Sequence, residues 1–174
     1  MGNNASELIK AKKVMQNIVS GHIYDMLAKV CDDLLADAVV SKEFQGFTGN
    51  TQTSYACGLY IDGALKYYIN QKMWSKSPVR KKVPKGVRVF LNKPYEGNPR
   101  AVTGRVDVDD LYGKDSSFDF LKSYKGFPDK SFGIVMATGT EYSEYIESVH
   151  NLNVLTDTFQ RAKQILSKNL KPIP

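Results

Sequence analysis

Residues 6–40 of this 174-residue chain carry one long amphipathic pattern. Its apolar residues recur at steps of three, four or their sums, the spacing of one face of an α-helix. They are Leu8, Ala11, Met15, Ile18, Met26, Val30, Leu34 and Ala38. A helix over residues 5–40 would be about 50 Å long, whereas a compact domain of this size has a radius of gyration of only about 16 Å. We therefore expect the helix either to break at Gly21, in Ser20–His22, or to extend toward a neighbouring molecule.

The stretch FTGNTQTSYACGLYIDG, residues 47–63, comes next and is rich in glycine and hydroxyl residues. A phosphate-binding loop would need the pattern G-x-x-x-x-G-K-[ST] after a strand. This stretch has no lysine and follows a helix, so we interpret it as a helix stop, at Gly46 or Gly49, and a turn. Beyond it, Tyr55, Cys57, Leu59 and Ile61 alternate as one face of a strand. Asp62–Gly63 predicts a hairpin before a second strand.

Residues 72–112 begin with a basic segment and are predicted to form a loop or hairpin insertion. We expect the segment to bind a partner through one aromatic residue and seven cations. These residues are Lys72, Trp74, Lys76, Arg80, Lys81, Lys82, Lys85 and Arg88. The cations could dock on an acidic protein surface, grip nucleic-acid phosphates while aromatic rings stack on bases, or simply remain solvated. Two alternating patterns, residues 86–92 and 100–110, then predict strands.

The last part, residues 113–174, predicts a short helix, a buried strand and a closing helix within the single domain 1–174. Ser116 or Ser117 can cap the short helix and Gly126 can stop it. FGIVMA, residues 132–137, has the length and composition of a buried strand. The closing helix, 155–170, is expected to bury five apolar positions and to expose Arg161, Lys163 and Lys168. The buried positions are Leu155, Phe159, Ala162, Ile165 or Leu166, and Leu170.

Composition and termini restrict the partners of the chain. No uncharged apolar run approaches the roughly 20 residues that span a membrane, so we expect no membrane partner. The first residues, MGNNASELIKAKKV, lack the apolar region of a secretory signal. Without export, Cys31 and Cys57 are expected to be free thiols. The net charge of +6 permits an acidic partner without requiring one.

Candidate catalytic and metal-binding residues do not form a recognisable constellation. Cys57 would need a base such as His150, yet it lies mid-strand on an apolar face. Two cysteines and two histidines show no paired zinc-ligand spacing. The acidic stretch DVDD (107–110) is interpreted as a solvated strand end, and the acids of EYSEYIE (141–147) as a solvated helix face. We predict no enzyme activity and no cofactor, and a Cys57 nucleophile remains the least favoured alternative.

The order of these segments resembles the head–tail joining and tail-completion (neck) proteins of tailed bacteriophages. In both, a long amphipathic helix precedes TGN and a nearby serine, here TGNTQTS at residues 48–54. Their second half has a strand, a tyrosine-rich segment and a closing helix. GIVMATGTEYSEYIESVHNLNVL fits that order, with Tyr142, Tyr145 and Glu147 at the matching positions.

The resemblance covers residues 5–70 and 130–170. Thr51 and Gln52 stand where an apolar and a basic residue usually follow TGN. The insertion 72–112 is longer than the family pattern, so the family says least about it.

The resemblance implies a fold, a function and a set of partners. The fold would be α+β, with a small, mostly antiparallel sheet packed by the long N-terminal helix and the C-terminal helix. The protein would be a non-enzymatic part of the phage neck or upper tail, forming a ring around the DNA conduit. Its partners would be further copies and neighbouring neck, portal or tail proteins, with possible contact to packaged DNA. It would be found in the host cytoplasm before assembly and in the virion afterwards. The alternative is a small nucleic-acid-binding protein that uses residues 72–88.

Overall fold

The computed structural model describes residues 3–44, 50–71, 89–90, 101–102, 112–140 and 143–172. Its helices are α1 (Asn3–Ser41), α2 (Asn50–Thr53), α3 (Tyr112–Ser123), α4 (Ser143–His150) and α5 (Thr156–Asn169). Its strands are β1 (Ala56–Ile61), β2 (Ala64–Asn70), β3 (Val89–Phe90), β4 (Ala101–Val102) and β5 (Phe132–Ala137). The main sheet has the order β2-β1-β5, with both pairings antiparallel. The predicted α+β fold class is confirmed.

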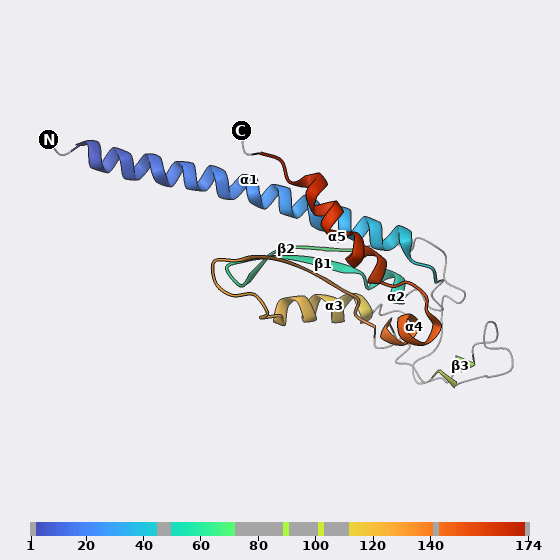
Figure 1. The fold of residues 1–174 in the computed structure, drawn as a ribbon. Helices are drawn as coiled ribbons and strands as arrows, with labels where there is room; N and C mark the ends of the chain where they lie inside the picture. The colour runs from blue at the N-terminus through green and yellow to red at the C-terminus, as the bar shows by residue number, and fades with distance from the viewer. Residues whose placement is uncertain are drawn as a thin grey trace.

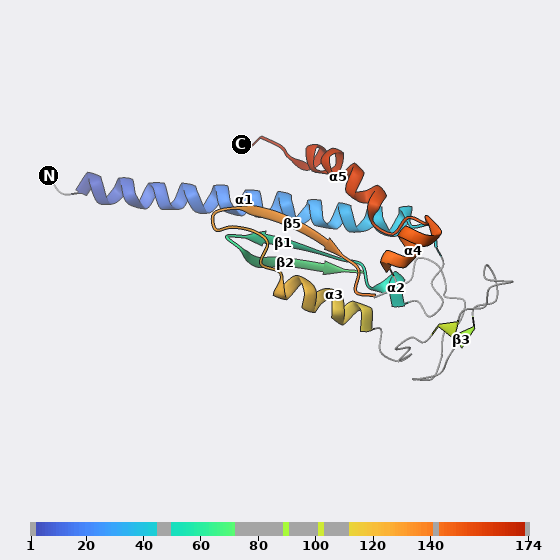
Figure 2. The ribbon, with the colours of Figure 1, turned by 60° about the horizontal axis from the view of Figure 1, so that its bottom comes forward.

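The main sheet lies between two helical layers (Figures 1 and 2). α1 and α5 cover one face, where Leu27, Val30 and Leu34 pack with Leu59 of β1. α3 covers the other face, where Leu121 packs with residues of β1 and β5. β3 and β4 form a separate antiparallel pair within the stretches predicted as strands. β1 is therefore the central element, paired on both edges and covered on both faces.

The β1–β2 hairpin has the predicted turn. Asp62 and Gly63 both have positive φ, 52° and 71°, as a two-residue type I′ turn requires. Cys57 and Leu59 face α1, and Tyr55, just before the strand, packs with Leu35 and Ala38 of the same helix. The predicted alternation is confirmed, and it fixes which side of the sheet receives α1.

α1 is a single helix of 39 residues, and it does not break at Gly21. Its first buried side chain is Leu27, and residues 4–21 are exposed along their whole length. Figure 1 shows this half extending past the sheet into open space. Of the two outcomes expected from the sequence, the extended helix is the one observed. α1 ends at Ser41, before the predicted stop at Gly46 or Gly49, which lie outside the described residues.

Residues 50–54, the described part of the TGNTQTS stretch, form a buried polar corner. Asn50 Oδ1 accepts a hydrogen bond from the backbone N–H of Gly113 (2.8 Å), and Thr140 Oγ1 donates to Thr51 Oγ1 (3.2 Å). A Cβ at Gly113 would lie 2.7 Å from Cβ of Ser54, so the close approach requires glycine. This corner joins three segments that are distant in the sequence: residues 50–54, the first turn of α3 and the residues after β5.

This corner corrects the predicted start of the third helix. α3 begins at Tyr112 instead of at Ser116 or Ser117, and Ser117 lies inside it. The reason is that Asn50, from a distant part of the chain, satisfies an N–H group of the first turn, as a local capping residue normally does. α3 also ends at Ser123, before Gly126.

α5 packs against the core with part of its predicted apolar face, because Ala162, Ile165 and Leu166 contact the core cluster as expected. Phe159 and Leu170 were expected to be buried, but they are 81% and 50% exposed. Arg161, expected on the outer face, donates to Asp37 of α1 through Nη2 (2.8 Å), and Thr158 Oγ1 donates to the same carboxylate (2.7 Å). Thr158 and Arg161, instead of Phe159, therefore lie against α1 at this end of α5. Arg161 holds the pKa of Asp37 below its usual value despite the opposing effect of burial.

Glu147 caps the N-terminus of α5. Its Oε1 accepts hydrogen bonds from the backbone N–H groups of Val154 (3.1 Å), Leu155 (2.8 Å) and Thr156 (2.7 Å). Burial acts to raise the pKa of Glu147, but the three N–H donors outweigh it and the pKa is lowered. The interpretation of this acid as part of a solvated face is therefore wrong, because its partners lie in the following loop.

We expect Asn50→Ala to destabilise the fold by about 1–2 kcal/mol, because it removes a cap and leaves a buried N–H without its acceptor. Urea unfolding followed by circular dichroism measures the change. Asn17→Ala, at an exposed position of α1, is the matched control and should change stability by less than about 0.5 kcal/mol. Equal stability of the two variants would contradict the assigned role of Asn50.

We expect Glu147→Gln to lower the free energy of unfolding near neutral pH, because it removes the charge from three hydrogen bonds. The folded-state pKa of Glu147 is lowered, so its contribution is complete above the unfolded value of about 4.3. The contribution is lost as pH falls through the folded pKa. The difference between wild type and Glu147→Gln should therefore shrink from pH 7 to pH 3. A difference that stays constant with pH would refute the charge-assisted cap.

Candidate assembly surface

The most distinctive surface of the molecule is the projecting segment, residues 4–21 of α1. An isolated helix of this length is marginal in water. Here it is continuous with the second half of α1, where Leu27, Val30 and Leu34 pack against the sheet. The packed half supplies the helix nucleus, so the projecting half can propagate from it. Among the described elements, none covers this extended half of the helix.

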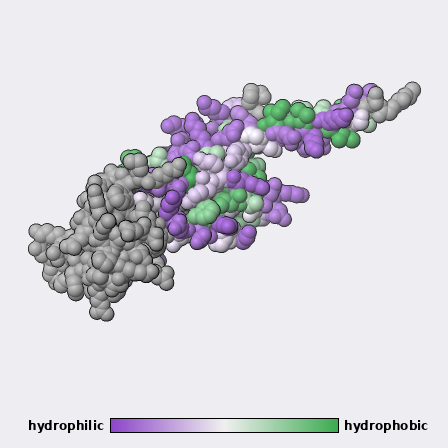
Figure 3. Space-filling view, turned by 180° about the vertical axis from the view of Figure 1, so that it is seen from behind, coloured by the Kyte–Doolittle hydropathy of each residue, from purple (hydrophilic) through white to green (hydrophobic). Residues whose placement is uncertain are grey.

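Large apolar side chains lie exposed along this segment. Leu8 is 70%, Met15 67% and Ile18 64% exposed. With their neighbours they form the apolar stripe: Leu8, Ala11, Val14, Met15, Ile18 and Val19. Figure 3 shows hydrophobic surface gathered on the projecting helix, interrupted by hydrophilic side chains. Contiguous exposed apolar surface of this kind marks a site of interaction.

The apolar stripe is not a continuation of the core-facing side of α1. At about 100° per residue, Leu8 and Met15 lie on the side of the helix roughly opposite Cys31 and Leu35. Cys31 and Leu35 are buried against the rest of the domain. The apolar pattern of the sequence therefore combines two faces of the helix, and only the face with Cys31 and Leu35 packs against the rest of the domain.

The heptad-like part of the stripe is confined to the projecting segment. Leu8, Ala11, Met15 and Ile18 follow each other at steps of three, four and three, the a/d spacing of a helix that packs on another surface. The next residue in that register is His22, which is polar, and Asp25 follows it. A partner is therefore expected to contact about three turns of helix and to stop where the domain begins.

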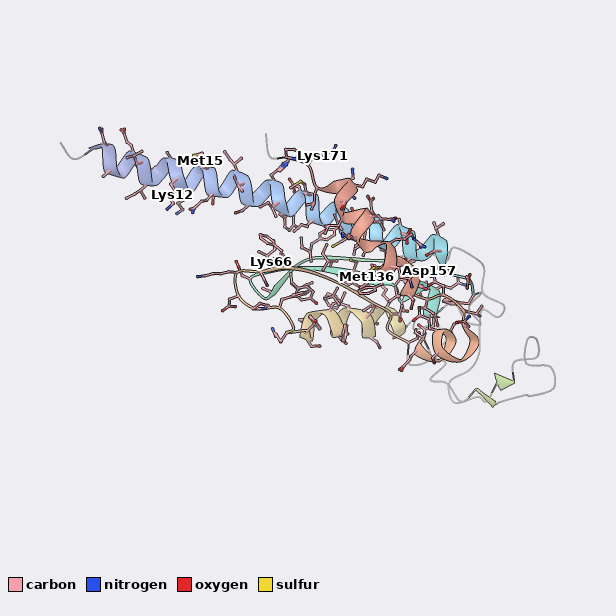
Figure 4. All side chains as sticks on the ribbon, in the orientation of Figure 1. Lys12, Met15, Lys66, Met136, Asp157 and Lys171 are labelled. Carbon is pink, nitrogen blue, oxygen red and sulfur yellow. The ribbon has the colours of Figure 1, made fainter. Side chains whose placement is uncertain are left out.

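Charge is distributed unevenly along α1. The projecting segment has three lysines, Lys10, Lys12 and Lys13, and one acid, Glu7. The rest of α1 has four aspartates and one lysine. Figure 4 shows Lys12 and Met15 on the projecting segment, with no other described element beside them. At about 100° per residue, only Lys12 lies beside the apolar stripe, whereas Lys10 and Lys13 lie on the side of the helix that carries Ser6 and Asn17.

The predicted partner-binding residues 72–88 all lie outside the described residues. The acidic stretch 107–110 and the side chain of His150 do as well. The partner contacts expected for residues 72–88 therefore stay predictions. The amphipathic pattern of the sequence includes Leu8, Met15 and Ile18, and all three lie exposed on the projecting segment, away from the sheet.

Cys57 has the surroundings of a structural thiol. It is completely buried, as is Cys31, and both are free. Its hydrogen bond with Cys31 and its burial raise the pKa of Cys57, which suppresses the reactive thiolate. The arrangement offers no activated nucleophile at this position.

The described parts of the chain contain no group of three or more His, Cys, Asp or Glu placed to hold a metal ion. Among the described helices, none combines the length and apolar character needed to cross a membrane.

We expect both thiols to resist a maleimide reagent at pH 7 while the protein is folded. Two equivalents should react after unfolding in guanidinium, because the chain has two cysteines and burial alone protects them. Mass spectrometry of the labelled protein measures both states. Rapid stoichiometric labelling of Cys57 in the folded protein would instead support a reactive thiol.

Comparison with known proteins gives no relative for this surface or this fold: no protein-family model, curated protein or solved structure matches the chain.

Proposed function

We propose that this protein is a non-enzymatic structural component that assembles with further copies of itself into a ring. The observation that carries the proposal is the apolar stripe, which no described part of its own domain covers. Burying such side chains is worth about 25 cal/mol per Å² of apolar area. A partner that covers Leu8, Met15 and Ile18 would therefore gain much of its affinity from the hydrophobic effect.

The assembly we propose is the neck or upper tail of a tailed bacteriophage, where the ring would surround the DNA conduit. This part of the proposal rests on the resemblance of residues 5–70 and 130–170 to head–tail joining and tail-completion proteins. The α+β architecture with two terminal helices on one face of a small sheet agrees with what that resemblance implies. The neighbouring proteins would be portal, neck or tail components, and the place of action would be the virion.

The rigidity of α1 suits a building part. Binding costs less conformational entropy when the docking element is already ordered. An unbroken helix anchored by Leu27, Val30 and Leu34 holds the stripe in one direction relative to the sheet. Repeated copies can then meet at the same angle, which closed symmetric assemblies require.

We expect Leu8→Glu/Met15→Glu to weaken self-association by at least about a hundredfold, because a carboxylate buried in an apolar interface costs several kcal/mol. Light scattering over a wide concentration range measures molar mass, and negative-stain micrographs of the same samples reveal rings. Ser6→Glu/Asn17→Glu is the matched control, since it adds the same charge to exposed positions on the other side of the same segment.

The wild type and the control should reach the same fixed oligomer, and the stripe variant should remain smaller. A wild type that is monomeric at every concentration would contradict self-assembly. Equal assembly of all three proteins would show that the stripe is not the contact surface.

A further inference from the structure

We propose that the projecting segments of two copies pack side by side, parallel and in register, so that the apolar stripe of one copy covers the stripe of the other. This contact rests on the self-assembly proposed above, and it adds which surface covers the stripe and which way the copies point. The partner of the stripe is a second copy of this chain.

The stripe has the residue spacing of a coiled-coil seam. In a heptad labelled a to g, Leu8 and Met15 take the a positions, and Ala11 and Ile18 take the d positions. All four residues are exposed within the described structure. Two helices that pack along such a seam bury their a and d residues against each other. The stripe therefore has the pattern of a surface that another helix covers.

The two borders of the stripe carry opposite charges. Glu7 lies at the g position on one border, and Lys12 lies at the e position on the other. Both side chains are exposed. Residues at e and g flank the seam of a coiled coil, where opposite charges form ion pairs between the helices and set partner choice and orientation. Glu7 and Lys12 therefore carry information about the partner of the stripe.

The spacing of these charges fits a parallel partner with the same sequence. When two identical helices lie parallel and in register, the g residue of one helix faces the e residue of the next heptad on the other. Glu7 of each copy would thus face Lys12 of the other. Val14 and Val19 are the following g and e residues, and they would meet as an apolar pair. Both flanking pairs are complementary in this arrangement.

An antiparallel contact gives no such complementarity. In that arrangement g residues face g residues and e residues face e residues. The g positions of the projecting segment hold Glu7, Val14 and Gly21, and its e positions hold Ala5, Lys12 and Val19. No antiparallel register places a glutamate opposite a lysine across these borders. The charges therefore select the parallel orientation.

The sheet does not obstruct this contact. Cys31 and Leu35, which are buried against the rest of the domain, lie on the side of α1 roughly opposite the stripe. When two stripes meet, the sheets of both copies therefore lie on the outside. His22 and Asp25 are the next residues in the a/d register, so the seam ends where the domain begins. Helices packed in parallel around one axis also have the cyclic symmetry that a ring requires.

Charge exchange at the two borders tests the contact and its direction. Glu7→Lys and Lys12→Glu should each weaken self-association about tenfold at low salt, because both border pairs of a contact change from attractive to repulsive. Light scattering over a wide concentration range measures the association. Lys13→Glu is the matched control, since it makes the same charge change on the side of the helix away from the stripe, and it should assemble like the wild type.

Two combinations of these variants should restore the contact. Glu7→Lys/Lys12→Glu in one chain should recover most of the lost association, because each lysine again faces a glutamate. An equal mixture of the Glu7→Lys and Lys12→Glu proteins should also associate more strongly than either protein alone. Failure of both combinations, with all variants folded by circular dichroism, would contradict the assigned pairs.

Cysteine cross-linking gives a second measurement, because the two native cysteines are fully buried. Leu8→Cys protein is oxidised gently and should form a disulfide with itself, since a disulfide needs Cα atoms within about 7 Å and Leu8 would face Leu8. Lys13→Cys, on the outer side of the helix, is the control and should cross-link weakly. Leu8→Cys mixed with differently tagged Ile18→Cys tests the antiparallel arrangement, because in the parallel one these positions are about 15 Å apart.

Each outcome of the cross-linking has a distinct meaning. A Leu8–Leu8 disulfide well above the Lys13 control supports the parallel contact. A Leu8–Ile18 disulfide that exceeds the Leu8–Leu8 disulfide would show antiparallel pairing and overturn the inference. Oligomers that depend on the stripe but give neither disulfide would overturn the inference and leave the proposed function standing. A monomer at all concentrations would overturn both.

Discussion

The packing of the second half of α1 against β1 is the contact on which the rest of the molecule depends. Leu27, Val30 and Leu34 meet Cys57 and Leu59 in one continuous apolar cluster. Because α1 does not break, fixing this half also fixes the direction of the exposed half. The hydrophobic effect within the domain thus stabilises a surface outside it, and the stripe needs no local support to be presented in a constant orientation.

Polar contacts between distant segments then place the remaining helices on this frame. Asn50 accepts a hydrogen bond from the first turn of α3, and Glu147 accepts one from the first residue of α5. Asp37 forms an ion pair with Arg161. Buried or half-buried hydrogen bonds of this kind contribute modestly to net stability but are costly to leave unmade, so they decide orientation more than they decide folding. The exposed Phe159 illustrates the point, because Thr158 and Arg161 contact α1 where the apolar pattern predicts Phe159. Ala162, Ile165 and Leu166 still pack against the core.

Local patterns in the sequence predicted much of the fold. The amphipathic spacing indicated α1, Asp62–Gly63 indicated the hairpin, and FGIVMA indicated β5, because each signal lies within the element it describes. The start of α3, the buried side of α5 and the role of Glu147 depend on partners far along the chain, so local spacing could not reveal them. Part of the apolar stripe was visible in the sequence as Leu8, Met15 and Ile18. That the stripe and the core-facing side of α1 point in different directions becomes clear only when the helical rotation from Ile18 to Leu27 is followed.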